Sequence, residues 1–284
     1  MDQLVINFHI LQRCNFNCYY CYSKWKIQNN NELHTDLNLT GKLLSDVYQY
    51  FKSLGWKRLR LSLVGGEPFL LKNLGSIIET AHKIGFDIAI ISNGSMISEK
   101  FIFRYAKLLQ WIGFSIDAIE NEQMLKIGRA SCSSGKTVDI KQLIQKILFL
   151  RSCNPNIGIK INTVVNNHNF DGNIEPFIKT VMPDKWKILQ VLPILDPQIA
   201  ISDDQFRFFI DRHKQFSDIW AIEDNDAMIG SYIMLDPMGR FFDNSHSNGQ
   251  NGYIYSEPVL KVGSKQAFKQ INFDLKKFAK RYKK

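Results

Sequence analysis

The residues of this chain best suited to chemistry are three closely spaced cysteines near its start. Cys14, Cys18 and Cys21 stand in the spacing C-x3-C-x2-C. Thiolates in such runs hold iron-sulfur clusters, and a [4Fe-4S] cluster that only carries electrons normally takes four of them. With three ligands, one iron keeps an open coordination position. The spacing therefore predicts a cluster that binds a further molecule directly and takes part in a reaction.

A structural zinc site is the main alternative for these cysteines. Zinc in such sites takes four nitrogen or sulfur ligands, usually arranged as two pairs. The remaining cysteines, Cys132 and Cys153, are isolated, and neither His9 nor His34 lies at a recognised ligand spacing. A zinc-containing nucleic-acid-binding protein stays open as the non-enzymatic alternative, which the metal content of the purified protein would distinguish.

Length and composition favour a single enzyme-sized domain in a reducing compartment. The chain has 284 residues, 45% of them hydrophobic, and no linker divides it. Its five cysteines, three of them clustered, do not suggest a disulfide framework. The first apolar segment spans only seven residues, too short for a signal peptide or a membrane span. We therefore expect a cytoplasmic protein that does not bind membranes.

The net charge of +9 and the pI of about 9.2 favour a polyanionic partner. Nucleic acid, an acidic membrane surface and a small polyphosphate all fit this charge. Part of the excess positive charge lies in the C-terminal run of lysines, and such a run is typical of a solvated helix face. Charge alone does not choose among these partners.

Apolar strands alternate with amphipathic helices along the chain, which predicts βα units around a parallel sheet. The expected strands are 4–10, 58–64, 86–91, 111–116, 157–165 and 188–192. Helices are expected after a Thr40 cap, over 74–84, after a Ser98 cap and over 138–150. The polar motifs follow the strands, and in parallel α/β folds this rim gathers binding and catalytic groups.

Polar groups suited to ligand binding recur at the predicted strand ends. The sequence Gly65-Gly66-Glu67-Pro68 follows the second strand, and Asn93 follows the third. Ser115 ends the fourth strand, and Arg129 lies beyond it, where a guanidinium can grip a carboxylate with two hydrogen bonds. Asp117 is interpreted as an ordinary strand-end polar residue outside the site.

The cysteine spacing, with GGEP one strand later, resembles the radical S-adenosylmethionine (SAM) superfamily. The resemblance implies a partial (βα)6 barrel of the TIM type over about residues 1–195. Residues 196–284 would form a C-terminal extension that closes over the substrate. It further implies a [4Fe-4S] cluster on the three cysteines and SAM on its open iron. SAM would contact the residues Tyr20, Gly65, Gly66, Glu67, Asn93, Ser115 and Arg129, with Glu67 on its ammonium and Arg129 on its carboxylate.

Further segments resemble one family within that superfamily, the antiviral viperins, in the same order along nearly the whole chain. They include 4–22, 65–70, 91–95, 127–129, 160–162 and 231–236. The resemblance implies a nucleoside triphosphate substrate, one of CTP, UTP, GTP or ATP, and a chain-terminating 3′-deoxy-3′,4′-didehydro product. A 5′-deoxyadenosyl radical would remove the ribose 4′ hydrogen. Flavodoxin or ferredoxin would supply electrons, and no stable nucleic-acid binding is expected. The amphipathic extension of vertebrate viperins is lacking, which predicts a soluble protein.

A triphosphate needs several fixed cations around it. Arg60, Lys160, Lys185 and Lys187 lie on predicted strands or beside them, where a charge is costly without an anion. The resemblance adds Asn7 and Asn162 as ribose contacts, Lys280 and Arg281 as tail residues over the phosphates, and Tyr232 at the substrate. Lys160 and Tyr232 are the candidate catalytic residues. Another radical SAM activity, on RNA or on a peptide, stays open as the alternative.

Overall fold

The computed structural model describes residues 2–21, 31–192, 197–245 and 253–282. The strands are β1 Gln3–His9, β2 Arg58–Val64, β3 Asp87–Ser92, β4 Leu109–Ser115, β5 Gly158–Val165, β6 Lys185–Gln190, β7 Trp220–Glu223, β8 Ile233–Leu235, β9 Arg240–Asp243 and β10 Ile254–Pro258. The α-helices are α1 Leu37–Ser53, α2 Leu74–Ile84, α3 Glu99–Tyr105, α4 Asn121–Lys126, α5 Ile140–Cys153, α6 Glu175–Val181, α7 Asp203–Arg212, α8 Asn225–Met228, α9 Val259–Val262, α10 Ser264–Phe268 and α11 Leu275–Tyr282.

All strands join one curved sheet in the order β10-β9-β8-β1-β2-β3-β4-β5-β6-β7. The strands from β8 to β7 run parallel, and β9 and β10 continue the sheet antiparallel beyond β8. Within the described residues no strand pairing joins β7 to β8, so the barrel is open on that side. The predicted partial barrel is confirmed. The C-terminal extension adds strands to the same sheet.

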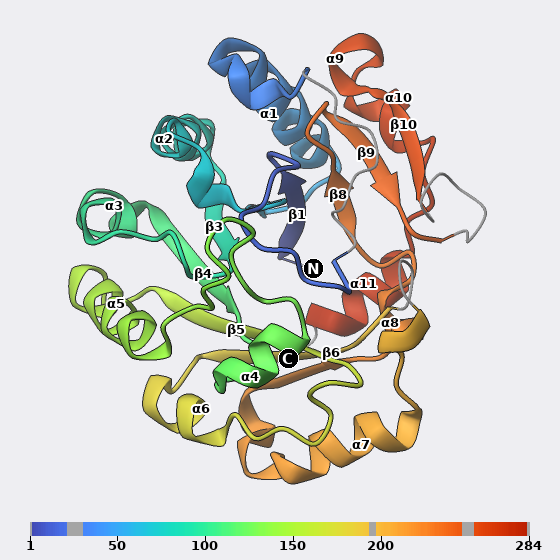
Figure 1. The fold of residues 1–284 in the computed structure, drawn as a ribbon. Coiled ribbons are helices and arrows are strands. Elements are labelled where there is room, and N and C mark those ends of the chain that lie inside the picture. Colours follow the sequence, from blue (N-terminus) through green and yellow to red (C-terminus); the bar gives the residue numbers. More distant parts are fainter. Residues whose placement is uncertain (1, 22–30, 193–196, 246–252, 283–284) are drawn as a thin grey trace.

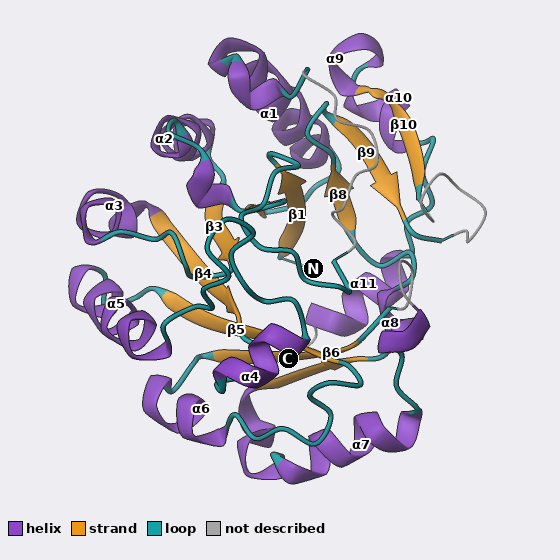
Figure 2. Ribbon diagram, viewed as in Figure 1, coloured by secondary structure: helices purple, strands orange, loops and turns teal. Residues whose placement is uncertain are grey.

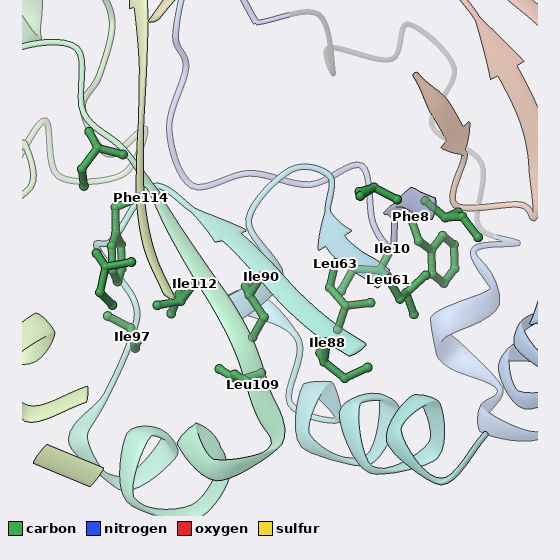
Figure 3. Close-up of a cluster of buried hydrophobic side chains, with 14 of the residues drawn as sticks. Phe8, Ile10, Leu61, Leu63, Ile88, Ile90, Ile97, Leu109, Ile112 and Phe114 are labelled. Atoms are coloured by element: carbon green, nitrogen blue, oxygen red, sulfur yellow. The ribbon is translucent and has the colours of Figure 1, made fainter. Parts of the chain in front are cut away.

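Successive side chains along each strand point to opposite faces of the sheet. Leu4, Ile6 and Phe8 of β1 are buried, whereas Val5 and Asn7 line an internal cavity. The helices α1, α2, α3, α5 and α6 cover the outside of the sheet (Figure 1, Figure 2). Figure 3 shows the resulting core, in which side chains of β1 to β4, including Phe8, Leu61 and Ile90, fill the space on the helix side.

Most predicted elements lie where the sequence placed them. β2 and α2 have the predicted bounds, and Ser98 caps α3 by accepting the Phe101 N–H at 3.2 Å. The Thr40 cap is wrong. Asp36 caps α1 by accepting the N–H groups of Asn38 and Leu39, and the Thr40 hydroxyl donates to the Leu33 and Asp36 carbonyls inside the first turn.

The sixth strand starts at Lys185, three residues before the predicted start at residue 188. Its first residues alternate between the two faces, so Lys185 and Lys187 point to the cavity while Trp186 is fully buried behind them. The apolar run that follows predicts a later start than the pairing of β6 with β5 gives. The correction puts both lysines on the strand itself, where the sheet fixes their positions.

Candidate active site

A cavity of about 510 Å³ lies inside the curve of the sheet, within the size range of small-molecule sites. Its wall contains residues from all strands between β1 and β6, together with residues around β8. Nearly every predicted site residue lines it. The exceptions are Glu67 and Lys280, and the side chain of Arg281 lies outside the described residues. Residues separated by more than 200 positions are thereby brought to one cavity.

The cysteines stand at one end of the cavity, half-buried and as free thiols. The Phe16 N–H donates to Cys14 Sγ at 3.4 Å, and Arg129 Nη1 donates to Cys18 Sγ at 3.8 Å. Burial raises the pKa of the Cys14 thiol to about 11 and that of the Cys18 thiol to about 12. Iron would displace these protons, because only the thiolate is a metal ligand.

The cysteine end fits a cluster better than a single ion. A zinc ion would draw its sulfur ligands to about 2.3 Å from one point. Cys14, Cys18 and Cys21 all line one cavity, so their sulfurs face a shared space. A [4Fe-4S] cluster binds each thiolate through a different iron, so the three sulfurs need only face one space. These residues therefore fit the cluster.

The loop after β2 packs directly against the cysteine loop, because two glycines allow it. Gly66 N–H donates to the Leu11 carbonyl at 2.9 Å, and Glu67 N–H donates to the Arg13 carbonyl at 3.0 Å. A Cβ on Gly66 would lie 1.9 Å from the Arg13 oxygen, and Gly65 has a positive φ of 133°. Only glycine fits this approach. The glycines thus help to fix the loop that carries the cysteines.

The Glu67 carboxylate does not line the cavity in this structure, and its direct contact with SAM stays a prediction. Glu67 is fully buried and does not line the cavity. Its carboxylate accepts hydrogen bonds from Ser92 Oγ at 2.8 Å, from the Asn93 N–H at 2.8 Å and from the Phe69 N–H at 3.1 Å. Burial raises the pKa of Glu67, and these hydrogen bonds oppose the rise. The side chain therefore joins its loop to the end of β3 and positions Asn93, which does line the cavity.

Arg129 is held by Asp117, a residue that the sequence analysis left outside the site. Arg129 Nη1 lies 3.1 Å from Asp117 Oδ2, and both side chains are almost completely buried. The Tyr20 hydroxyl accepts from Arg129 Nη1 at 3.0 Å and donates to Asp117 Oδ2, and Arg129 Nη2 donates to the Ser115 carbonyl. Asp117 Oδ1 accepts the Val164 N–H at 2.8 Å. Its place at the same rim as the other motifs was the signal that it belongs here.

Another part of the cavity wall is strongly basic. Arg60 of β2, Lys160 of β5, and Lys185 and Lys187 of β6 all line it. Lys160 pairs with Lys185 in the sheet register, and Asn162 pairs with Lys187. Burial lowers the pKa of Lys160 well below its usual range, and the neighbouring cations Lys187, Lys185 and Arg60 lower it further. Such crowding of like charges indicates a site built for a polyanion.

Two contacts orient groups at this basic part. Arg60 Nε donates to Gln110 Oε1 at 2.9 Å, and its guanidinium lies 5.3 Å from the centre of the Trp111 ring. The Asn162 side-chain oxygen is buried and has no hydrogen-bond partner among the described residues. Because a buried polar atom normally has a partner, this oxygen points to a missing ligand.

Lys187, Tyr232 and Glu223 form a closed triangle of polar contacts. Lys187 Nζ lies 2.9 Å from Glu223 Oε1 and donates to the Tyr232 hydroxyl, which in turn donates to Glu223 Oε2. Glu223 is only 4% exposed. The sequence analysis did not single out Glu223, since a lone glutamate at the end of a short strand gave no signal.

Lys280 does not reach the cavity in this structure; it is an exposed residue of α11. The helix itself lies near the amino ends of the strands. Asp274 N–H, just before it, donates to the Gly230 carbonyl at 2.8 Å, and the Phe278 ring lies 6.1 Å from Trp56, which precedes β2. Closure of this tail over the phosphates stays a prediction. Asn244 and Tyr253 also line the cavity wall, and residues 246–252 between them lie outside the described part.

Comparisons with known proteins show the family of the chain. The family model of the Radical SAM superfamily matches residues 8–179. The chain is 42% identical to an S-adenosylmethionine-dependent nucleotide dehydratase of Psychrobacter lutiphocae, over 99% of this chain and 95% of that one. It is 34% identical to the protein of the same name from Pseudoalteromonas ulvae, over 99% and 94%.

Among solved structures, the fold is similar to that of native anSMEcpe with bound AdoMet. The TM-score is 0.65 at 12% identity, with 98% of this chain and 82% of that one covered. At that identity the likeness concerns the fold alone. Within the described residues, no helix combines the length and the apolar character needed to cross a membrane.

Proposed function

The chain belongs to the radical SAM superfamily and, within it, to the S-adenosylmethionine-dependent nucleotide dehydratases, and on this premise we propose that it dehydrates a nucleoside triphosphate to the 3′-deoxy-3′,4′-didehydro nucleotide. One observation carries the proposal. The same cavity has a set of three cysteines at one end and the basic residues Arg60, Lys160 and Lys185 in another part of its wall. A cluster site and a polyanion site thus face one enclosed space.

The cofactors are a [4Fe-4S] cluster and SAM. Cys14, Cys18 and Cys21 would hold the cluster, and Asn93 and Arg129 are the lining groups best suited to the polar end of SAM. When bound, the two together supply the radical that removes a hydrogen atom from the substrate. The protein residues bind and orient both molecules and keep water out of the cavity.

The spacing along β5 suits a ribose joined to phosphates. Asn162 lies two residues beyond Lys160 on the same face, a separation of about 7 Å at the usual rise of a strand. We assign the ribose to Asn7 and Asn162 and the phosphates to Arg60 and Lys185, with Lys160 between the phosphates and the 3′ hydroxyl of the ribose. The buried, unpartnered oxygen of Asn162 supports a ribose hydroxyl as its donor. Lys187 lies at the level of Asn162, so we place it near the ribose.

Lys160 and Tyr232 are the proposed catalytic residues, acting on the departing 3′ hydroxyl. A lysine whose pKa lies below its usual range gives up a proton more readily than an ordinary lysine. Tyr232 presents a hydroxyl that is already hydrogen-bonded to an ammonium and a carboxylate. Either group would hold a proton at the oxygen that leaves as water.

The basic groups argue against RNA as the substrate. They line a cavity of about 510 Å³ inside the curve of the sheet, which suits a single nucleotide, whereas RNA-binding proteins place their cations on an exposed surface or groove. We further propose that the protein is cytoplasmic and takes electrons from a flavodoxin or ferredoxin. Its five free cysteines support a reducing compartment.

Turnover with each triphosphate tests the proposal. The reduced, cluster-loaded protein is incubated with SAM and with CTP, UTP, GTP or ATP in parallel. We expect 5′-deoxyadenosine together with a nucleotide lighter by one water, for at least one of the four. Cleavage of SAM that is independent of every triphosphate would contradict the proposed function.

A further inference from the structure

Glu223 contacts two cavity residues without lining the cavity itself. Its Oε1 atom lies 2.9 Å from Lys187 Nζ, and its Oε2 atom accepts the Tyr232 hydroxyl. Lys187 and Tyr232 both line the cavity, whereas Glu223 is buried behind them. The Lys187 ammonium also lies 4.7 Å from the centre of the Tyr232 ring. The carboxylate therefore acts on the cavity only through these two groups.

The triangle spans the opening of the barrel. Lys187 belongs to β6 and Glu223 ends β7, at one edge of the sheet. Tyr232 directly precedes β8, which pairs with β1 on the other side of the opening. In the described residues no backbone pairing joins β7 to β8, and only the short helix α8 and its flanking residues connect them (Figure 1). Side chains thus hold together two walls that the sheet leaves apart.

Charge gives Glu223 a second effect. Four cations face one cavity: Arg60, Lys160, Lys185 and Lys187. The other three lower the pKa of Lys160, whereas the Glu223 carboxylate raises it. Glu223 also forms an ion pair with Lys187. The ion pair with Glu223 and the hydrogen bond to the Tyr232 hydroxyl fix Lys187 beside Tyr232.

We propose that Glu223 is a positioning residue that fixes the Tyr232 hydroxyl and the Lys187 ammonium against the ribose of the substrate. This inference rests on the proposed function. A shift of about 1 Å in such groups is enough to lower a rate a hundredfold. Triphosphate binding should depend less on Glu223 than the rate does, because Arg60, Lys160 and Lys185 still hold the phosphates.

The test compares E223Q and E223D with the wild type, using the full chain loaded with its cluster. For E223Q we expect kcat for the nucleotide product to fall about tenfold to a hundredfold. KM for the triphosphate should change less than about threefold. The ratio of 5′-deoxyadenosine to nucleotide product should rise, because SAM is still cleaved while the ribose is wrongly oriented. E223D keeps the charge and should recover part of kcat.

Controls separate positioning from general damage. Glu257 forms an exposed ion pair with Lys261, so E257Q should leave kcat, KM and the ratio unchanged. Iron content and triphosphate binding by calorimetry are measured for every variant, and both should stay near the wild-type values in E223Q and E223D. Y232F should raise the same ratio, and the double variant should be little worse than either single one, since the two residues share one contact.

Two results would overturn the inference while leaving the proposed function intact. One is an E223Q protein with wild-type kcat and an unchanged ratio. The other is a loss of product that comes entirely from a higher KM, which would make Glu223 a determinant of binding. If the wild type makes no lighter nucleotide from any triphosphate, the proposed function itself fails, so the two failures are distinguishable.

Discussion

The Arg129 guanidinium and the Asp117 carboxylate form an ion pair of 3.1 Å from which solvent is excluded. The pair lies beside Cys18, whose sulfur accepts from the same guanidinium nitrogen at 3.8 Å. Arg129 Nε is buried without a partner among the described residues. Asp117 therefore fixes the arginine in place and leaves Nε as a donor for a ligand, which is the arrangement expected of a preorganised SAM site.

Removing the charge of Asp117 should lower both the stability of the fold and the affinity for SAM. D117N leaves the Arg129 charge buried and unpaired, and such losses cost about 3–5 kcal/mol of folding free energy. SAM affinity should fall as well. Denaturant unfolding and a SAM binding titration check both. D87N removes the partner of the exposed Arg58 and should cost no more than about 1 kcal/mol. Equal losses in the two variants would contradict the buried role of Asp117.

A methyl group on Gly66 should disturb the cysteine loop. In G66A the added Cβ would meet the Arg13 carbonyl oxygen at 1.9 Å, and backbone cannot swing aside as a side chain can. We expect a destabilisation of about 1–3 kcal/mol or more, with less iron per chain after reconstitution. G41A is the matched control, since its nearest neighbour would be Thr80 Cγ2 at 3.5 Å. Full iron loading of G66A would refute the prediction.

Triphosphate binding should take up a proton at Lys160. Burial and the adjacent Lys187, Lys185 and Arg60 lower the pKa of Lys160 in the free protein, although Glu223 raises it in part. Bound phosphates favour the ammonium, so the affinity should fall as the pH rises above the lowered pKa. Calorimetry in two buffers of different ionisation enthalpy counts the protons. K160M should bind more weakly at low pH and show a flatter pH profile, and a profile as steep as that of the wild type would assign the proton elsewhere.

The lowered pKa of Lys160 also predicts how the stability of the nucleotide-free protein depends on pH. The unfolded chain keeps Lys160 protonated up to its ordinary pKa, whereas the folded protein releases that proton at a lower pH. Between these two values the unfolded state binds more protons, so the contribution of Lys160 to stability rises with pH. Thermal unfolding across that range, with K160M for comparison, measures this contribution. A Lys160 contribution that falls with pH would contradict the lowered pKa.

Trp111 should support phosphate binding through Arg60. The guanidinium lies 5.3 Å from the ring centre, and a partly desolvated contact of this kind contributes about 1–2 kcal/mol. W111A should therefore raise KM for the triphosphate by about fivefold to thirtyfold, with W111F closer to the wild type. F208A removes a ring under Arg212 on the exposed face of α7 and should leave KM unchanged. Equal changes of KM in W111A and F208A would contradict a role for the contact between the Trp111 ring and Arg60.

The sequence by itself determined the features that depend on near neighbours. The cysteine spacing, the glycine pair and the alternation of strands and helices are local, and β2 and α2 begin and end at the predicted residues. Arg60 and Lys160 were expected in the site because a charge on a strand is costly without an anion, and Asn7 because of the family resemblance; all three line the cavity.

Only the tertiary structure decided which partner each buried polar group has. Glu67 bonds to the end of β3, Asp117 holds Arg129, and Glu223 joins Lys187 to Tyr232. The sequence does not show whether the carboxylate of an aspartate or glutamate faces a ligand, solvent or a buried cation. Its role depends on which strands the chain brings side by side and on how much water remains there, and both are set by contacts between residues far apart in sequence.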